Sequence, residues 1–535
     1  MSSSPPLTST LVKLQATLWR RTVKGNAAAL VMITMISIYS LLGLISMTFA
    51  LAVGLDQGNQ GILPGVVAVG TLAYCIAAIM WPSGEGQLDP ASFSTMPVKA
   101  KQLIPGFAVS TLMQSRGVTA LICTLVTTIV AAIFLPLSTL PLLIIMMAIS
   151  LVTTLLLGEL IASGASGSSS RVSKERMSIF ATLGFLVFLL GYNFLISAGG
   201  MNQIDALGRF AKWTPVGAGA GVVEAFATQS WWQCALLSGL ALLYVVAGVW
   251  LWRFLLDNAL RAPLDRGGQG NSKTQNQHQK KGDAKVLLLP RVSWSAGGAV
   301  FSRALRYIIR DSRLLASLIT FPLLGLLFIF QSFTVEFFMI YVGLIMMAAF
   351  GGSLATNDFG YDGPATWLHI VSGVKAKTLL LPRHWASMFP GGVMLILYIA
   401  LTIALAENKT IAVLISSIGV GIYISGAAVA LFVTTFNPYP TSKPGTSPWG
   451  DRSGYSGAAF IGAFAALLLG WIPTVPAIAL GAVGYQSQTT WMLILGEILA
   501  LVIPVLMYLF IVRSCVSRVE HKMPEIFDKV RNFVK

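Results

Sequence analysis

The feature that most constrains the fold of this chain is a succession of long apolar runs. About twelve of them approach or exceed the roughly 18 residues that a helix needs to cross the hydrocarbon core of a membrane. Of the 535 residues, 55% are hydrophobic and only 10% are charged, which is too few charges to cover a globular surface of this size. The runs are residues 29–53, 61–81, 115–136, 138–162, 177–198, 233–256, 315–334, 336–355, 387–406, 410–436, 455–473 and 490–513.

A chain segment in hydrocarbon must satisfy its backbone hydrogen bonds internally, and this sequence lacks the short alternating strands of a membrane barrel. The runs therefore predict an all-α polytopic membrane protein with about twelve transmembrane helices. Lys and Arg set the expected orientation because they collect in cytoplasmic loops. With a cytoplasmic N-terminus, only Arg209, Lys212 and Lys409 of the 36 Lys and Arg residues fall in outer loops. Both termini are therefore expected in the cytoplasm.

Charge and motifs exclude several classes of protein. The net charge is +16, but the basic residues punctuate apolar runs instead of clustering with aromatics, so we expect membrane lipid and not nucleic acid as a partner. No GxxxxGK[ST], GxSxG or HExxH motif occurs, so neither ATP hydrolysis nor hydrolase chemistry is expected on this chain. The cysteines are isolated and the histidines fall in polar segments, which predicts no metal, haem or other cofactor. These histidines are His278, His369, His384 and His521.

A polar segment divides the chain into two similar halves. Residues 261–297 contain GGQGNSKTQNQHQKKGDAK, whose composition is typical of a flexible linker. We therefore predict six spans in residues 1–260 and six in residues 298–535, running parallel because the offset of six is even. A basic amphipathic stretch precedes each half, as expected for a helix in the headgroup layer. The apolar positions of these stretches are Leu11, Leu14 and Leu18, and then Phe301, Leu305 and Ile308.

Two cytoplasmic loops share a pattern of an acid, a Pro-Ala pair and the segment VKAK. The first copy covers residues 89–101 and the second covers residues 362–377. One interpretation is a pair of coupling elements, each moved by a motor that docks from the cytoplasm. The other is a solvated connector whose lysines only enforce topology. The candidate coupling residues are Asp89, Pro90, Phe93, Pro97, Lys99, Lys101, Asp358, Asp362, Pro364, Lys375 and Lys377.

Two further features concern the interior and the outer end of the spans. Trp213-Thr-Pro215 and Trp471-Ile-Pro473 precede the last span of each half, and small residues follow them, which predicts re-entrant helical turns. Glu159 and Glu497 are the ionisable groups expected to lie inside the membrane. An acid there is costly and is a candidate for a transport pathway. The alternatives are helix capping, a hydrogen bond between helices, or access to headgroup water.

The loop sequences LDPASFSTMPVKAKQLIPG (88–106), NDFGYDGPATWLHIVSGVKAKTLLLPR (357–383) and YPTSKPGTSPW (439–449) accompany these Trp-x-Pro segments. Together they resemble the fused, twelve-span permeases of bacterial ABC-2-type exporters, especially those of actinobacteria. The resemblance implies two six-helix bundles, each with an amphipathic elbow helix, a coupling loop and an outer re-entrant pair, in the bacterial cell membrane. It also implies a separate ATP-binding cassette ATPase, a homodimer that carries the ATP and magnesium.

The expected function is therefore that of a permease subunit that exports a hydrophobic or amphiphilic compound, such as a drug, an antibiotic or a lipid, and so could confer antibiotic resistance. The first loop lacks the Asn357-Asp358-Phe359-Gly360 of the second, so the halves are expected to engage their ATPase subunits unequally. The competing hypothesis is a secondary carrier with twelve spans, driven by an ion gradient. A structural or enzyme-anchoring membrane protein is a third class, for which the sequence offers no support.

Overall fold

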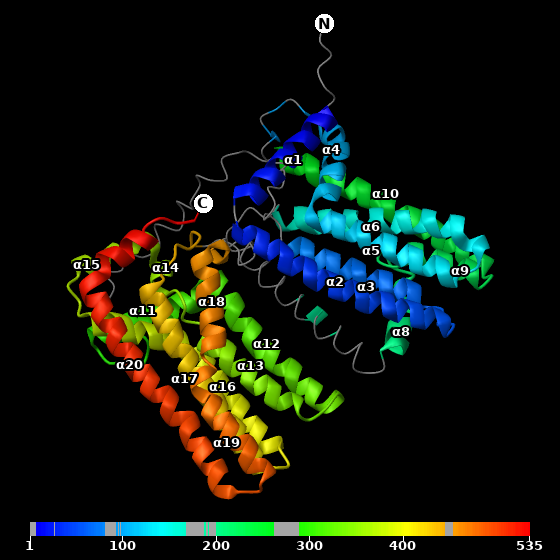
Figure 1. Ribbon diagram of the computed structural model, residues 1–535. Coiled ribbons are helices and arrows are strands. Elements are labelled where there is room, and N and C mark those ends of the chain that lie inside the picture. The colour runs from blue at the N-terminus through cyan, green and yellow to red at the C-terminus, as the bar shows by residue number, and fades with distance from the viewer. Residues whose placement is uncertain are drawn as a thin grey trace. The chain divides into compact units, whose positions relative to one another are not determined.

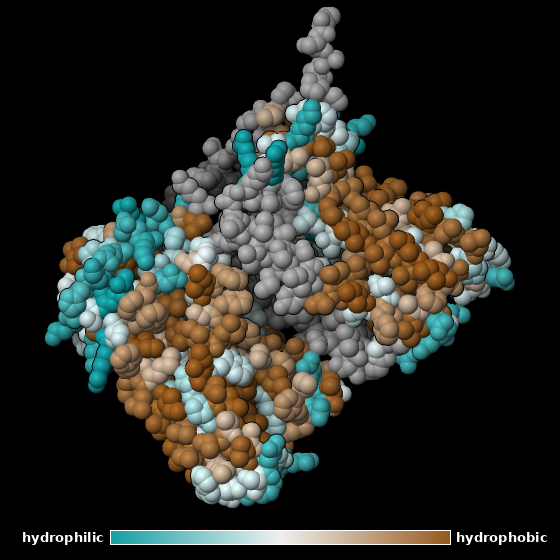
Figure 2. All heavy atoms as spheres, viewed as in Figure 1, coloured by the Kyte–Doolittle hydropathy of each residue, from teal (hydrophilic) through white to brown (hydrophobic). Residues whose placement is uncertain are grey.

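The computed structural model describes residues 7–25, 27–80, 93–94, 96, 98–166, 200–261, 288–444 and 453–534, with isolated positions at 184, 187–188 and 191. Among these residues the regular secondary structure is helical, and no strand occurs. The chain forms two compact units, Met1–Thr274 and Gln275–Lys535, and the division falls in the predicted linker. Figure 1 shows that each unit is a bundle of long helices, and Figure 2 shows that their outer surfaces are largely hydrophobic.

Eight helical stretches among the described residues are long and apolar enough to cross a membrane, which confirms an all-α polytopic membrane protein. The number twelve stays a prediction, because the expected span 177–198 lies almost entirely outside the described residues. One expected span, 336–355, is shorter than predicted: its helix α13 has 14 residues, or about 21 Å. The eight stretches are Ser115–Phe134, Leu137–Ser163, Trp231–Leu260, Arg313–Thr334, Ala376–Leu405, Lys409–Phe436, Gly457–Gln486 and Thr490–Val530.

The first unit packs its helices around a core of aliphatic side chains. Leu51, Leu63, Leu143, Val222 and Leu237 are buried there, and they come from five different helices. The elements are α1 (Leu7–Gly25), α2 (Ala27–Asp56), α3 (Ile62–Met80), α4 (Ala100–Met113), α5 (Ser115–Phe134), η2 (Leu137–Thr139), α6 (Leu140–Ser166), α8 (Met201–Ala211), α9 (Ala218–Ala227) and α10 (Trp231–Arg261).

Helix α8 lies unusually close to the start of α3. A Cβ atom placed on Gly208 would stand 1.7 Å from the carbonyl oxygen of Gly61, so only glycine allows this approach. The contact also satisfies a free backbone donor at the N-terminus of α3, because the Gly61 N–H donates to Asp205 Oδ1 at 2.7 Å. The close contact between Gly208 and Gly61 thus fixes α8, a short amphipathic helix, at this end of the bundle.

The second unit is organised around α17, the most deeply buried of its apolar helices. Its core includes Leu344, Leu395, Ile422 and Ala500, from α13, α16, α17 and α20. The elements are α11 (Ala296–Arg310), α12 (Ser312–Thr334), α13 (Met339–Gly352), α14 (Asp358–Asp362), η5 (Gly363–Thr366), α15 (Trp367–Val371), α16 (Ala376–Leu405), α17 (Lys409–Phe436), η7 (Ser453–Tyr455), α18 (Gly457–Leu469), η8 (Ile472–Thr474), α19 (Val475–Gln486) and α20 (Thr490–Val530).

The two VKAK segments occupy the same kind of position. Helix α4 begins at Ala100 with Lys99 as its N-cap, and α16 begins at Ala376 with Lys375 as its N-cap. In each unit the basic amphipathic helix packs against this start, α1 on α4 and α11 on α16. We call this end of each unit the VKAK end. In Figure 1, the VKAK end of the second unit also holds α14, α15 and the last turns of α20, whereas α19 lies at the opposite end.

Candidate functional site

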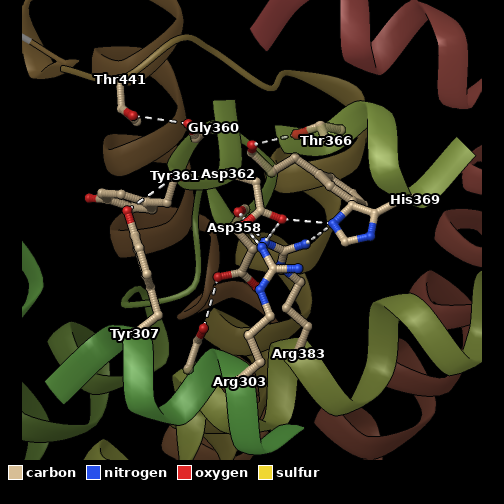
Figure 3. Close-up of polar contacts among 12 residues, drawn as sticks. Arg303, Tyr307, Asp358, Gly360, Tyr361, Asp362, Thr366, His369, Arg383 and Thr441 are labelled. Carbon is tan, nitrogen blue, oxygen red and sulfur yellow. Dashed lines mark hydrogen bonds and ion pairs between the residues drawn. The ribbon is translucent and has the colours of Figure 1, made fainter. Parts of the chain in front are cut away.

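A buried network of charges lies at the VKAK end of the second unit and is centred on Asp362 (Figure 3). Arg303 Nη2 of α11 donates to Asp362 Oδ1 at 2.8 Å, and Arg383 Nη2 of α16 donates to Oδ2 at 2.5 Å. His369 Nε2 of α15 lies 2.8 Å from the same Oδ2. The side chains of Asp362 and Arg383 are 7% and 10% exposed, so this pair is almost fully removed from solvent. The Asp362 carboxylate therefore joins α11 and α16 to the loop that carries α14, η5 and α15. It also holds α15 in place within that loop.

The local sequence explains how the loop turns at this carboxylate. Gly363 follows α14 with a φ of +51°, a left-handed conformation that glycine adopts without strain. Pro364 then stands in the first turn of η5, where its missing N–H costs nothing. The loop is also tied to the segment after α17, because Asn357 Nδ2 donates to Tyr439 O at 2.9 Å and Thr441 Oγ1 donates to Gly360 O at 2.9 Å.

Asp358 is a second buried carboxylate of the loop. Its Oδ1 accepts a hydrogen bond from Ser387 Oγ at 2.8 Å, while its Oδ2 is buried and has no partner among the described residues. Arg383 Nη2 donates to the backbone oxygen of Asp358 at 2.9 Å and not to its carboxylate. Burial raises the pKa of Asp358 to about 6, against the opposing effects of Arg383 and the Ser387 hydrogen bond.

The pKa of Asp362 shifts in the opposite direction to that of Asp358, although burial alone would raise it as well. The charge of Arg383, the hydrogen bond from His369 and the charge of Arg303 outweigh that burial and hold the pKa of Asp362 well below its usual range. Two acids four residues apart thus have separated pKa values. The difference arises because Asp362 faces the cations and Asp358 faces a hydroxyl.

A second ion pair stands beside the first and anchors the start of α12. Arg313 Nη2 donates to Asp311 Oδ2 at 2.6 Å, and both side chains are buried. The same guanidinium donates to Ser442 O, and its Cζ atom lies 5.1 Å from the ring centre of Tyr361. Tyr307 Oη donates to Tyr361 O at 3.1 Å. The loop is therefore held from the side of α11 and α12 as well.

On top of this network, α15 exposes apolar side chains. The exposed fractions are 48% for Trp367, 46% for Leu368, 41% for Ile370 and 71% for Val371. Pro364, Lys375 and Lys377 are exposed on either side of the helix. In Figure 2, hydrophilic atoms gather at this end of the second unit, around α15 and along the end of α20, while the helices below are brown. The apolar side chains of α15 thus lie in a polar surface, apart from the long apolar helices.

The predicted coupling residues separate into inward and outward groups. The carboxylates of Asp358 and Asp362 bind partners within the second unit, and Phe93 is buried, with its ring 6.0 Å from that of Phe107. Lys99 and Lys101, like Lys375 and Lys377, are exposed. Asp89, Pro90 and Pro97 lie outside the described residues.

The two predicted intramembrane acids differ in their surroundings. Glu159 of α6 is buried and accepts a hydrogen bond from Arg116 Nη2 of α5 at 2.7 Å, so it forms an ion pair between helices. Glu497 of α20 is half-buried and does not belong to any of the described ion pairs.

His384 corrects a prediction from sequence: it does not lie in a polar segment but is fully buried within α16. Its ring stacks on Tyr508, and neither ring nitrogen has a partner among the described residues.

The two Trp-x-Pro segments have different structures. Trp213 and Pro215 lie between α8 and α9, and α9 is a short, almost fully buried helix in contact with α3, α6 and α10. An unexpected buried ion pair supports this turn, Lys212 Nζ to Glu224 Oε1 at 2.8 Å. Trp471 and Pro473 instead interrupt the apolar stretch Gly457–Gln486. That stretch is long and apolar enough to cross a membrane as a broken helix, and the re-entrant turn at Trp471 and Pro473 stays a prediction.

Sequence reasoning missed the basic partners of Asp362. From sequence, Arg303 belongs to the basic amphipathic stretch before the second half, Arg383 ends the loop sequence 357–383, and His369 falls in a polar segment, with no partner predicted for any of them. A signal was present, since His369 lies seven residues after Asp362 in one short loop.

Within the parts of the chain that the structure describes, no group of three or more His, Cys, Asp or Glu could hold a metal ion. Comparisons with models of protein families, with curated proteins and with solved structures find no match to this chain.

Proposed function

We propose that this chain is the permease subunit of an ATP-binding cassette exporter, and that a separate cassette ATPase docks on α15. The observation that carries the proposal is the apolar surface of α15, held in place by the buried network beneath it. Exposed Trp, Leu, Ile and Val on one short helix are the kind of anchor that fills a pocket in a partner protein. The end of α20 beside this helix carries both acidic and basic side chains, and this mixed charge suits a protein partner.

Rigidity matters for this role because a docking helix must transmit a displacement without yielding. Asp362 ties the loop to α11, α15 and α16, and Asn357 and Thr441 tie it to the segment after α17. In this proposal Asp358 and Asp362 stabilise the interior of the loop, and the exposed side chains of α15 contact the ATPase. This assignment revises the sequence-based expectation that Asp362 itself touches the ATPase.

The similar VKAK ends of the two units support a duplicated arrangement. Each has a helix that begins within VKAK and an amphipathic helix packed on its start. In this proposal each unit engages one subunit of an ATPase homodimer, which carries ATP and magnesium. Both VKAK ends and both termini face the cytoplasm of a bacterial cell, and the positive charges there accord with that orientation.

The proposed cargo is a hydrophobic or amphiphilic compound that moves outward as one bundle rocks against the other. The apolar character of the long helices supports this class of substrate, since few charged groups are placed to recognise a polar solute. The outer elements α8 and α9, with the ion pair between Lys212 and Glu224, then belong to the exit side.

The test is a charge placed on the exposed face of α15. Val371→Glu should abolish binding of the proposed cassette ATPase, and with it the stimulation of ATP hydrolysis, while the protein still inserts and folds. Val335→Glu is the matched control, because Val335 is 56% exposed but lies between α12 and α13, at the opposite end of the unit. Equal ATPase binding by the two variants would refute docking on α15.

One observation favours the competing hypothesis of an ion-coupled secondary carrier. His384 is a buried imidazole without a hydrogen-bond partner among the described residues, inside a candidate span, and such a group could accept a proton during transport. A carrier would move its substrate under a proton gradient without nucleotide, and His384→Phe would remove that activity. The exporter would keep its nucleotide dependence in the same variant.

A further inference from the structure

The last helix of the chain extends far beyond what a membrane requires. Helix α20 has 41 residues, or about 60 Å, roughly twice the thickness of the hydrocarbon core. Near its end the helix is kinked at Lys522, whose φ of −127° and ψ of 20° are not helical. Pro524 accounts for the kink, because it lacks the N–H that would bond to the carbonyl of Glu520. The residues after the kink therefore take a new direction.

The segment after the kink lies on the loop that carries α15. Met523, Ile526 and Val530 are buried and share one helix face, with the spacing i, i+3, i+7. Met523 and Ile526 belong to the same apolar cluster as Phe359 of α14 and Leu380 of α16. α20 also contacts η5 and α15. The C-terminal turns thus pack on the loop.

Two contacts after the helix complete this arrangement. A Cβ atom placed on Gly363 would lie 2.8 Å from Cε1 of Phe533, so the phenyl ring rests directly on the turn that follows α14. The N–H of Val534 donates to Thr441 O at 2.9 Å, and Thr441 in turn donates to Gly360 O. The end of the chain therefore joins the two segments that Asn357 also connects.

We propose that residues Met523–Val534 form a C-terminal clamp that fixes the α14–α15 loop to α20. With the clamp closed, the loop and the last helix move as one body, so a displacement of α15 reaches the far end of α20, beside α19. With the clamp open, the loop keeps its ion pairs to α11 and α16, and Phe359 keeps the cluster that it shares with Cys515 and Val519, but the loop loses the contacts of residues 523–534. The role of the loop as a docking site rests on the proposed function, whereas the clamp itself does not.

Hydrogen exchange of the full chain, measured by mass spectrometry without any partner, tests the clamp. Ile526→Gln puts an amide into the buried cluster and should open the clamp, so exchange should rise at least tenfold in residues 523–534 and also in residues 357–366. Lys529→Gln is the control from the exposed face of the same helix and should leave both segments unchanged. Faster exchange in residues 523–534 with an unchanged loop would overturn the proposal, as would no change in either segment.

A second variant opens the clamp from the side of the loop. Gly363→Ala pushes against Phe533, so exchange should also rise in residues 523–534. Gly373→Ala is matched to it, because Gly373 has a φ of +61° but open space around its Cβ position. Equal exchange of residues 523–534 in these two alanine variants would contradict the proposed contact. Because no ATPase is present, failure of the clamp and failure of ATPase docking are separate results.

Discussion

Replacing Asp362 by Asn tests whether the charge network holds the second unit together. The substitution keeps the size of the side chain but removes its negative charge. Arg383, whose side chain is only 10% exposed, then loses the carboxylate with which it forms its ion pair. The contact with Arg303 matters less, because that side chain is 54% exposed and a pair of this kind contributes at most about 1 kcal/mol.

Breaking a buried ion pair on one side costs about 3–5 kcal/mol, since the remaining charge is buried without compensation. For a unit of this size, each kcal/mol lowers the melting temperature by about 2–4 °C, so Asp362→Asn should melt on the order of 10 °C lower. Intrinsic fluorescence of the 13 tryptophans during heating in detergent gives the measurement. Asp528→Asn is the control, because Asp528 is exposed and pairs with Arg531 on the surface.

Adding Arg383→Met to Asp362→Asn removes the uncompensated cation as well. The double variant should therefore melt higher than Asp362→Asn alone, since replacing both members of a buried pair costs less than replacing one. A melting temperature for Asp362→Asn equal to that of the unmodified protein would refute the structural role of this network. A double variant that melts lower than the single variant would contradict the pairing itself.

Two further predictions concern stability. Because the pKa of Asp358 is raised from 3.8 to about 6, the folded protein binds the extra proton, so its stability should fall by about 3 kcal/mol as the pH rises from about 4 to about 6. Asp358→Asn mimics the protonated acid, and its thermal melts should lack this pH dependence; an unchanged slope would contradict the assignment. Gly208→Ala should lower the melting temperature by separating α8 from α3, whereas Gly239→Ala in α10, with nothing within 4 Å, should not, and equal melts would exclude the close approach.

The sequence was most informative where one physical requirement acts alone. Apolar length predicted membrane helices. The two VKAK segments were predicted to lie in loops, whereas they lie at the starts of α4 and α16. The same reasoning failed for His384, because the edge of a span was placed where hydrophobicity rises, at residue 387, whereas α16 begins at Ala376. Helix α16 continues through polar residues because its N-terminal turns pack against α11 and α20 and not against lipid.

The partners of the charged residues could not be predicted from sequence. Asp362 and Arg383 are 21 residues apart, and Lys212 and Glu224 are 12 residues apart, so only the path of the backbone brings them together. Asp362 was expected to face a partner protein, because an acid in a loop usually faces solvent. The folded loop gives it three donors instead, and this leaves the apolar side chains of α15 as the exposed group.

The most direct test of the central proposal is transport in proteoliposomes that contain the full chain and a lipophilic fluorescent dye. The account predicts no dye movement under a proton gradient alone, and ATP-driven movement once the proposed partner ATPase is added. Val371→Glu should lose that ATP-driven movement, and Val335→Glu should retain it. Transport by the chain alone under a proton gradient, without nucleotide or ATPase, would contradict the account.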